Sequence, residues 1–129
     1  MNAHLLSFAP TYRGAGISRY VRNLISHLLR ARSDYQFTVF LGDGNLPPDW
    51  RDSDALRAVV ARWPTVKPAV RIGWEQFIQP LEVRRRGIDV LHSMGYVKPI
   101  ASRCPSVVTV YDLSFLIYPD TFNRANQLY

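Results

Sequence analysis

Two hydrophobic periods alternate along the chain, and this alternation constrains the fold more than any other feature. Apolar residues recur every three or four positions over 16–31 and 69–86, which is the spacing of amphipathic helices. Short apolar or β-branched runs predict strands at 4–9, 35–41, 88–92 and 106–111. Because strands that alternate with helices favour a parallel sheet, we predict an α/β fold with a Rossmann-like parallel sheet and helices on both faces.

Three local features refine this pattern. Pro80 lies inside the second helix and should kink it there, because proline lacks a backbone donor, and Gly87 is a natural C-terminal stop. The run 56–63 fits either a helix or a strand, and we favour a strand over 57–62. Residues 122–129 have the composition of a starting helix.

Length and composition indicate one domain. The 129 residues are 47% hydrophobic, which suffices for a single core, so we assign residues 1–129 to one domain. Cys104 is the only cysteine, so no internal disulfide can form and a reducing compartment is favoured. No apolar run reaches the ~18 residues of a membrane span, and the N-terminus lacks the basic start of a signal peptide. We therefore expect a cytoplasmic protein.

The chain is basic, with a formal net charge of +6. A basic balance favours anionic partners such as phosphorylated ligands, nucleic acid or an anionic membrane. The densest run, residues 84–86, is either a solvated helix end that complements the helix dipole or a segment attracted to a membrane. No recognised nucleic-acid-binding motif is present.

A glycine-bracketed turn precedes the first predicted helix. Gly14 and Gly16 match the first two glycines of GxGxxG, but Arg19 occupies the third position, which disfavours nicotinamide or flavin binding. The segment also lacks the GxxxxGK[ST] loop of nucleoside triphosphatases. Two interpretations remain: a turn whose backbone amides accept a diphosphate, or a tight turn without a ligand.

Polar residues follow the last two predicted strands. His92 stands at the carboxyl end of one strand, the end at which parallel sheets bind ligands, although it could equally be a structural histidine. Tyr111 and Asp112 end the next strand, and Asp112 could hold a substrate hydroxyl or cap the following turn. His4 and His27 look structural. We expect no metal site, because the histidines and Cys104 lack ligand spacing, and no GxSxG elbow supports a hydrolase.

Three segments together resemble the N-terminal half of family 4 glycosyltransferases. The first, "GAGISRYVRNLISHLL" (14–29), is similar to that family's "GGIGRYVRNLLRAL". The second, "WEQFIQPLEVRRRGIDVLHS" (74–93), is similar to its "WEQ…LP…G.DVLHS" stretch, and the third, "PSVVTVYDLSFLIYPDTF" (105–122), to its "PVVVTIHDLSFL..PE.F" stretch. The segments occur in the family's order and spacing.

The resemblance implies a GT-B fold, two facing Rossmann-like domains, and a role for each matching residue. Gly14 and Gly16 match the loop that lies against the donor diphosphate, His92 matches a residue lining the acceptor side, and Asp112 matches the aspartate of the family's His-Asp pair. Tyr111 stands where the family usually has histidine, and with an ordinary pKa of ~10 it is a poor base at neutral pH.

The resemblance also implies the reaction and its partners. Family enzymes transfer a sugar, such as mannose, with retention from a GDP- or UDP-sugar, without a cofactor and without an established protein nucleophile. The nucleotide is held mainly by a C-terminal domain, so we expect an acceptor-side domain that is incomplete at its C-terminus and inactive alone.

The acceptor would be a glycan or a lipid-linked molecule. Arg71 and residues 84–86 suggest peripheral contact with an anionic membrane, and we expect no nucleic-acid partner. The alternative is a non-catalytic Rossmann-like module that binds a partner protein or nucleic acid.

Overall fold

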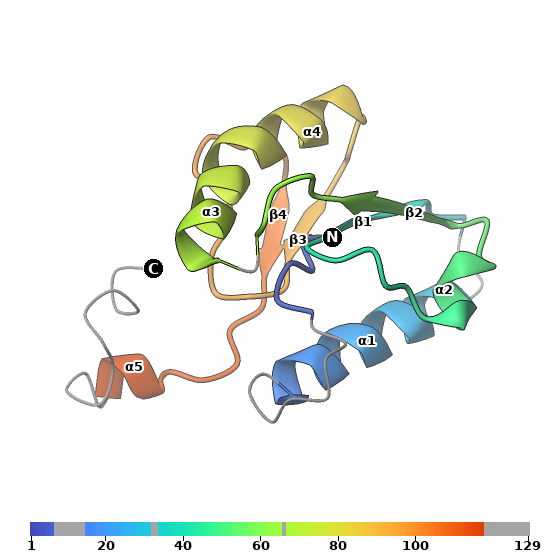
Figure 1. Ribbon diagram of the computed structural model, residues 1–129, viewed down its shortest axis with the longest axis horizontal. Coiled ribbons are helices and arrows are strands. Elements are labelled where there is room, and N and C mark those ends of the chain that lie inside the picture. Colours follow the sequence, from blue (N-terminus) through green and yellow to red (C-terminus); the bar gives the residue numbers. More distant parts are fainter. Residues whose placement is uncertain (7–14, 32–33, 66, 118–129) are drawn as a thin grey trace.

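The structure, a computed structural model, describes residues 1–6, 15–31, 34–65 and 67–117. It is a mixed α/β arrangement whose strands form short parallel pairs (Figure 1). The helices are α1 Ala15–Arg30, α2 Pro48–Arg51, α3 Pro68–Gly73, α4 Gln79–Arg85 and α5 Ser114–Ile117, with a π-helical turn at Trp74–Ile78. The strands are β1 Phe37–Leu41, β2 Leu56–Val60, β3 Leu91–Ser93 and β4 Ser106–Val108.

The N-terminal residues connect the two strand pairs. β1 pairs in parallel with β2, and β3 pairs in parallel with β4. Asn2 forms isolated parallel bridges to Phe40 of β1 and Ser93 of β3. The Ala3 N–H donates to the Phe40 carbonyl at 2.9 Å, and the Asn2 N–H donates to the His92 carbonyl at 2.7 Å. The neighbours therefore follow the order β2, β1, residues 1–3, β3, β4.

The predicted strands differ from the observed ones mainly at their ends. β1 and β2 confirm the strands predicted at 35–41 and 57–62, and β3 and β4 form within or beside the runs at 88–92 and 106–111. The prediction at 4–9 is wrong for His4 and Leu5, because the Leu6 N–H closes a turn onto the Ala3 carbonyl at 2.9 Å. The rest of that run, residues 7–9, lies outside the described residues, as do residues 122–129.

The second predicted helix forms over 68–85, but its irregularity is a π-helical turn rather than a simple kink at Pro80. In this turn the Gln79 N–H donates to the Trp74 carbonyl, five residues earlier. Pro80 follows at once, where the wider turn separates the proline ring from the preceding carbonyls. Figure 1 shows the helical run bending between α3 and α4.

Gly87 ends this helix, as its position in the sequence predicts. Its φ is +61°, in the left-handed region, and the Ile88 N–H donates to the Val83 carbonyl at 3.1 Å. This is the hydrogen bond of a Schellman cap, which satisfies a carbonyl that the helix leaves unpaired.

Buried side chains form two clusters, and successive residues of β1 belong to different ones because side chains alternate along a strand. Val39 and Leu41 pack with Val21 and Ile25 of α1 in the first cluster. Phe40 packs in the second cluster, whose other buried members are Trp74, Val83 and Leu91.

α2 is fixed to α1 by a polar contact inside the first cluster. The Trp50 side chain is 1% exposed, and its Nε1–H donates to Ser26 Oγ at 2.8 Å. Ser26 Oγ in turn donates to Asp49 Oδ2 at 2.8 Å. Because the indole nitrogen has a partner, burying this large side chain leaves its polar atom satisfied.

Candidate functional site

Three tyrosines from different parts of the chain meet where β3 and β4 end. Tyr20 comes from the second turn of α1, Tyr96 follows β3 and Tyr111 follows β4. The Tyr20 and Tyr111 rings are edge-to-face, with centroids 5.4 Å apart, and the Tyr96 and Tyr111 centroids are 5.7 Å apart. We call these residues the tyrosine cluster. It brings the start of α1 beside the residues that follow β3 and β4.

Tyr111 is the centre of the cluster, and its hydroxyl is already engaged. The O–H donates to the Met94 carbonyl at 2.7 Å. Burial, together with the smaller effects of the neighbouring Tyr20 and Tyr96, raises the pKa of Tyr111 to about 12. The phenol therefore stays protonated at neutral pH and holds the chain after β4 against the chain after β3.

His92 lies on β3 and reaches across to the residue that follows β4. Its Nε2 is 2.8 Å from Thr109 Oγ1, and the side chain is half-buried. Burial lowers the pKa of His92, and the positive amino terminus lowers it further. The imidazole is therefore neutral at pH 7, so it can exchange hydrogen bonds with a ligand without carrying charge.

Asp112 caps the turn that leads into α5. Its Oδ1 accepts hydrogen bonds from the Ser114 hydroxyl at 2.5 Å and the Ser114 N–H at 3.1 Å. These two hydrogen bonds lower the pKa of Asp112, which is exposed. The sequence left two roles open for Asp112, holding a substrate hydroxyl or capping the following turn. The hydrogen bonds of the capping role are present. The carboxylate is also ionised and accessible to a hydroxyl donor.

Of the two glycines in the turn before α1, Gly14 lies outside the described residues. Gly16 is the second residue of α1 and is exposed. Among the described residues, no atom lies within 4 Å of a Cβ added at Gly16, so their packing does not require glycine there.

No sequence pattern singles out Tyr20, Tyr96 or Thr109. Tyr20 lies on the apolar stripe of the helix and therefore resembles a core residue, yet it is 39% exposed. Tyr96 has a φ of +45°, which is uncommon for a residue other than glycine. Its N–H donates to the Thr109 carbonyl at 3.0 Å, which holds the unusual turn against the chain after β4.

A second polar group is buried between the N-terminal residues and the π-helical turn. Asn2 Nδ2 donates to Glu75 Oε1 at 2.9 Å and to Gln79 Oε1 at 3.4 Å. His4 packs on Trp74 with ring centroids 4.4 Å apart, and its Nδ1 is 3.2 Å from Thr65 Oγ1. These contacts support the structural role predicted for His4.

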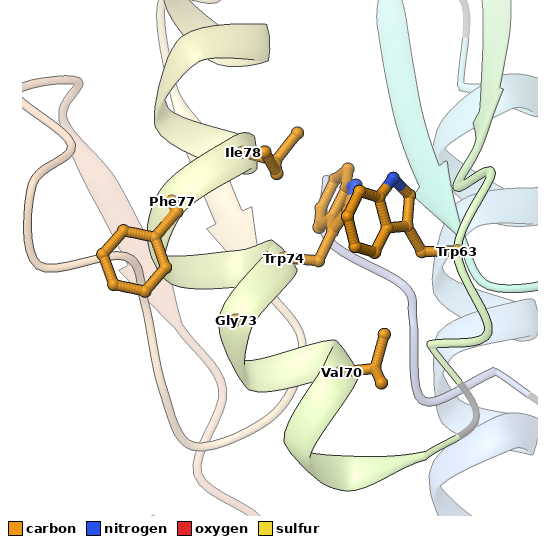
Figure 2. A pocket seen from close by; sticks show the side chains of 6 residues that line it. All are labelled: Trp63, Val70, Gly73, Trp74, Phe77 and Ile78. Atoms are coloured by element: carbon orange, nitrogen blue, oxygen red, sulfur yellow. The ribbon is translucent and has the colours of Figure 1, made fainter.

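An apolar hollow of about 300 Å³ lies between the same helical run and Trp63. Figure 2 shows Val70, Trp74 and Ile78 directed toward Trp63, whereas Phe77 points to the other side of the helical run. The hollow is lined by Trp63, Val70, Gly73, Trp74, Phe77 and Ile78. It contains none of the polar residues described above, so it is separate from the tyrosine cluster.

Within residues 1–6, 15–31, 34–65 and 67–117, no group of three or more histidine, cysteine, aspartate or glutamate side chains could hold a metal ion. None of the helices in these ranges is long and apolar enough to cross a membrane. No family model, curated protein or solved structure matches the chain.

Proposed function

We propose that the chain is the acceptor-side domain of a retaining glycosyltransferase that uses a sugar nucleotide as donor. The observation that carries this proposal is the tyrosine cluster together with His92. Tyr20, His92 and Tyr111 come from the three separate segments that resemble family 4 glycosyltransferases, and these segments meet at one end of β3 and β4. These segments lie beside the carboxyl ends of β3 and β4, the edge at which parallel α/β sheets bind ligands.

The order of the strands supports a Rossmann-like sheet. The hydrogen bonds of Asn2 and Ala3 set the N-terminal residues between β1 and β3, and every pairing is parallel. In such a sheet the first strand is central, and later strands are added first on one side of it and then on the other. Ligands bind at the carboxyl ends of the strands where this strand order reverses. The division of Val39 and Phe40 between two clusters is what helices on both faces would produce.

The proposed roles follow from charge and access. The start of α1 is the positive end of a helix dipole, and the open backbone at Gly16 would admit a diphosphate. Asp112 is an exposed carboxylate that can accept a hydrogen bond from a sugar hydroxyl, and neutral His92 can orient an acceptor. Tyr111 positions these segments rather than moving a proton, because its hydroxyl donates to Met94.

Titration of the isotopically labelled chain, followed by NMR, tests this proposal. UDP, GDP and their sugars should bind weakly, with a Kd of about 1 mM, because this chain would supply one side of a cleft. The shifted amides should lie at the start of α1 and around His92 and Asp112.

A matched pair of glycine variants locates the diphosphate. Gly16→Val should weaken binding at least about tenfold by filling the space beside the backbone, which corresponds to ~1.4 kcal/mol. Gly73→Val places the same side chain at another helical glycine with nothing within 4 Å, and should leave binding unchanged. Equal effects of the two variants on binding would rule out a diphosphate site beside Gly16.

Two further ligands separate the alternatives. NAD⁺ binding tighter than that of the sugar nucleotides would favour an oxidoreductase. Salt-dependent binding of duplex DNA would favour the non-catalytic module, for which the net charge of +6 is the supporting observation. Neither ligand should bind if the glycosyltransferase proposal is right.

A further inference from the structure

The helical run 68–85 carries an exposed apolar strip that no described part of the chain covers. The strip consists of Phe77, Ile78 and Leu81, whose exposed fractions are 75%, 37% and 58%. Residues three and four positions apart lie on one side of a helix, so the strip continues into Arg84 and Arg85. Both arginines are exposed. The outer side of this run is thus apolar along one part and basic at its end.

The apolar hollow extends the strip sideways. Phe77 and Ile78 belong to both, and Trp63, which is 61% exposed, forms the far wall of the hollow (Figure 2). Trp74, by contrast, is 6% exposed and packs against His4 and Phe40, so it closes the floor. The hollow therefore lies between the buried indole of Trp74 and the exposed indole of Trp63, and it is open to solvent.

The exposed charges of residues 67–86 all have the same sign. Lys67 and residues 84–86 are exposed and basic. Glu75 is 7% exposed and accepts a hydrogen bond from Asn2. Glu82 accepts a hydrogen bond from Arg86 at 2.8 Å and lies 4.0 Å from Arg85. Arg71 is half-buried, and its charge lowers the pKa of His4.

We propose that the strip and the hollow bind the surface of an anionic lipid bilayer. Phe77, Ile78 and Leu81 would enter the boundary between headgroups and acyl chains, while Arg84 and Arg85 reach lipid phosphates. The hollow takes part of one acyl chain, with Trp63 at the interface where tryptophan is favoured. Because the exposed charges of residues 67–86 are all basic, this surface complements the phosphates of an anionic bilayer. The inference does not depend on the proposed glycosyltransferase function.

Flotation of the full chain with vesicles tests the inference. The chain should float with vesicles of phosphatidylcholine and phosphatidylglycerol and much less with phosphatidylcholine alone, and added salt should release it. Fluorescence gives a second readout, because Trp50 and Trp74 are 1% and 6% exposed and Trp63 is 61% exposed. Brominated acyl chains should therefore quench Trp63 and Trp74, which line the hollow, but not Trp50, and Trp63→Phe should reduce the quenching.

Two double variants separate the apolar and basic contributions. Arg84→Gln with Arg85→Gln should lower partition into anionic vesicles about thirty-fold, since each arginine near the surface is worth ~1 kcal/mol. Phe77→Ser with Leu81→Ser should lower it at least about tenfold. Tyr35→Ser, which changes an aromatic residue that is 71% exposed, and Arg22→Gln with Arg51→Gln are matched controls that should bind normally.

Three results would overturn the inference. The first is equal flotation with anionic and neutral vesicles, and the second is an equal loss of binding in the control variants. The third is self-association of the chain without lipid that Phe77→Ser with Leu81→Ser abolishes, because the strip would then be an interface between copies of the chain.

Discussion

At the scale of single residues, burial decides the protonation of the groups that connect the chain's segments. Tyr111 and His92 both remain neutral near pH 7, because burial raises the pKa of the phenol and lowers the pKa of the imidazole. His4 shows the strongest such effect among the histidines. Its pKa is lowered to about 4, first by burial and then by the Arg71 charge.

The lowered pKa of His4 predicts that the protein loses stability in mild acid. The ring takes up a proton near pH 6.5 when unfolded and near pH 4 when folded. The unfolded state therefore binds more protons in this window, so the free energy of unfolding is highest above pH 6.5 and falls as the pH approaches 4. The loss should be about 3 kcal/mol. Urea unfolding at a series of pH values measures it.

The His4→Gln variant should reduce this slope. Part of the slope should survive in His4→Gln, because the pKa of His92 is lowered too. Burial also lowers the pKa of the amino terminus, from 8.0 to about 6. The free energy of unfolding should therefore fall as the pH is lowered from 8 to 6 as well. Identical slopes below pH 6.5 for the parent chain and His4→Gln would contradict this account.

At the scale of elements, the helical run 68–85 combines an irregular middle with a regular end. The π-helical turn Trp74–Ile78 places Glu75 and Gln79 toward Asn2 while Phe77 and Ile78 stay outside. Gly87 then ends the run with a positive φ. The irregular turn thus lies in the part of the run that contacts both the N-terminal residues and the hollow.

Two alanine substitutions in this run should have opposite effects. Gly87→Ala should lower the free energy of unfolding by about 1 kcal/mol, because an L side chain disfavours φ of +61°. Gly73→Ala should raise it by ~0.5 kcal/mol, because alanine restricts the unfolded chain and its Cβ would meet nothing within 4 Å. Thermal and urea unfolding measure both. Equal changes in the two variants would mean that the Gly87 cap contributes nothing specific.

At the scale of the whole molecule, Asn2 joins parts of the chain that are distant in sequence. Its backbone bridges β1 and β3, and its side chain donates to Glu75 and Gln79. The residue is 7% exposed, so these hydrogen bonds replace contacts with water. The two strand pairs and the helical run 68–85 therefore share one buried connection.

Removing this connection should weaken the entire fold rather than one element. Asn2→Ala should lower the free energy of unfolding by about 2 kcal/mol, because it deprives buried polar groups of a partner. Asn23→Ala, on the exposed side of α1, should change it by less than about 0.5 kcal/mol. Far-UV circular dichroism and tryptophan fluorescence should report a single transition in both variants. Separate transitions in Asn2→Ala would show that the two strand pairs fold independently.

Much of the secondary structure follows from local periodicity. The helical stripe predicts α1, the aromatic run predicts β1, and Gly87 ends the second helix as expected. The first predicted strand is wrong at His4 and Leu5, because hydrophobicity there does not distinguish a buried turn from a strand. The π-helical turn is missed because Pro80 by itself predicts only a kink, and the contacts of Glu75 and Gln79 with Asn2 join residues distant in sequence.

The candidate site divides in the same way. The sequence alone determined that polar residues end the last two strands and that Arg19 interrupts the dinucleotide fingerprint, because both are properties of neighbouring residues. Only the tertiary structure decided that Tyr20 packs on Tyr111, that the Tyr111 hydroxyl is used by Met94 and that Asn2 joins the strand pairs. The physical reason is that these contacts depend on how distant segments pack, and local spacing carries no information about which distant side chain will be the partner.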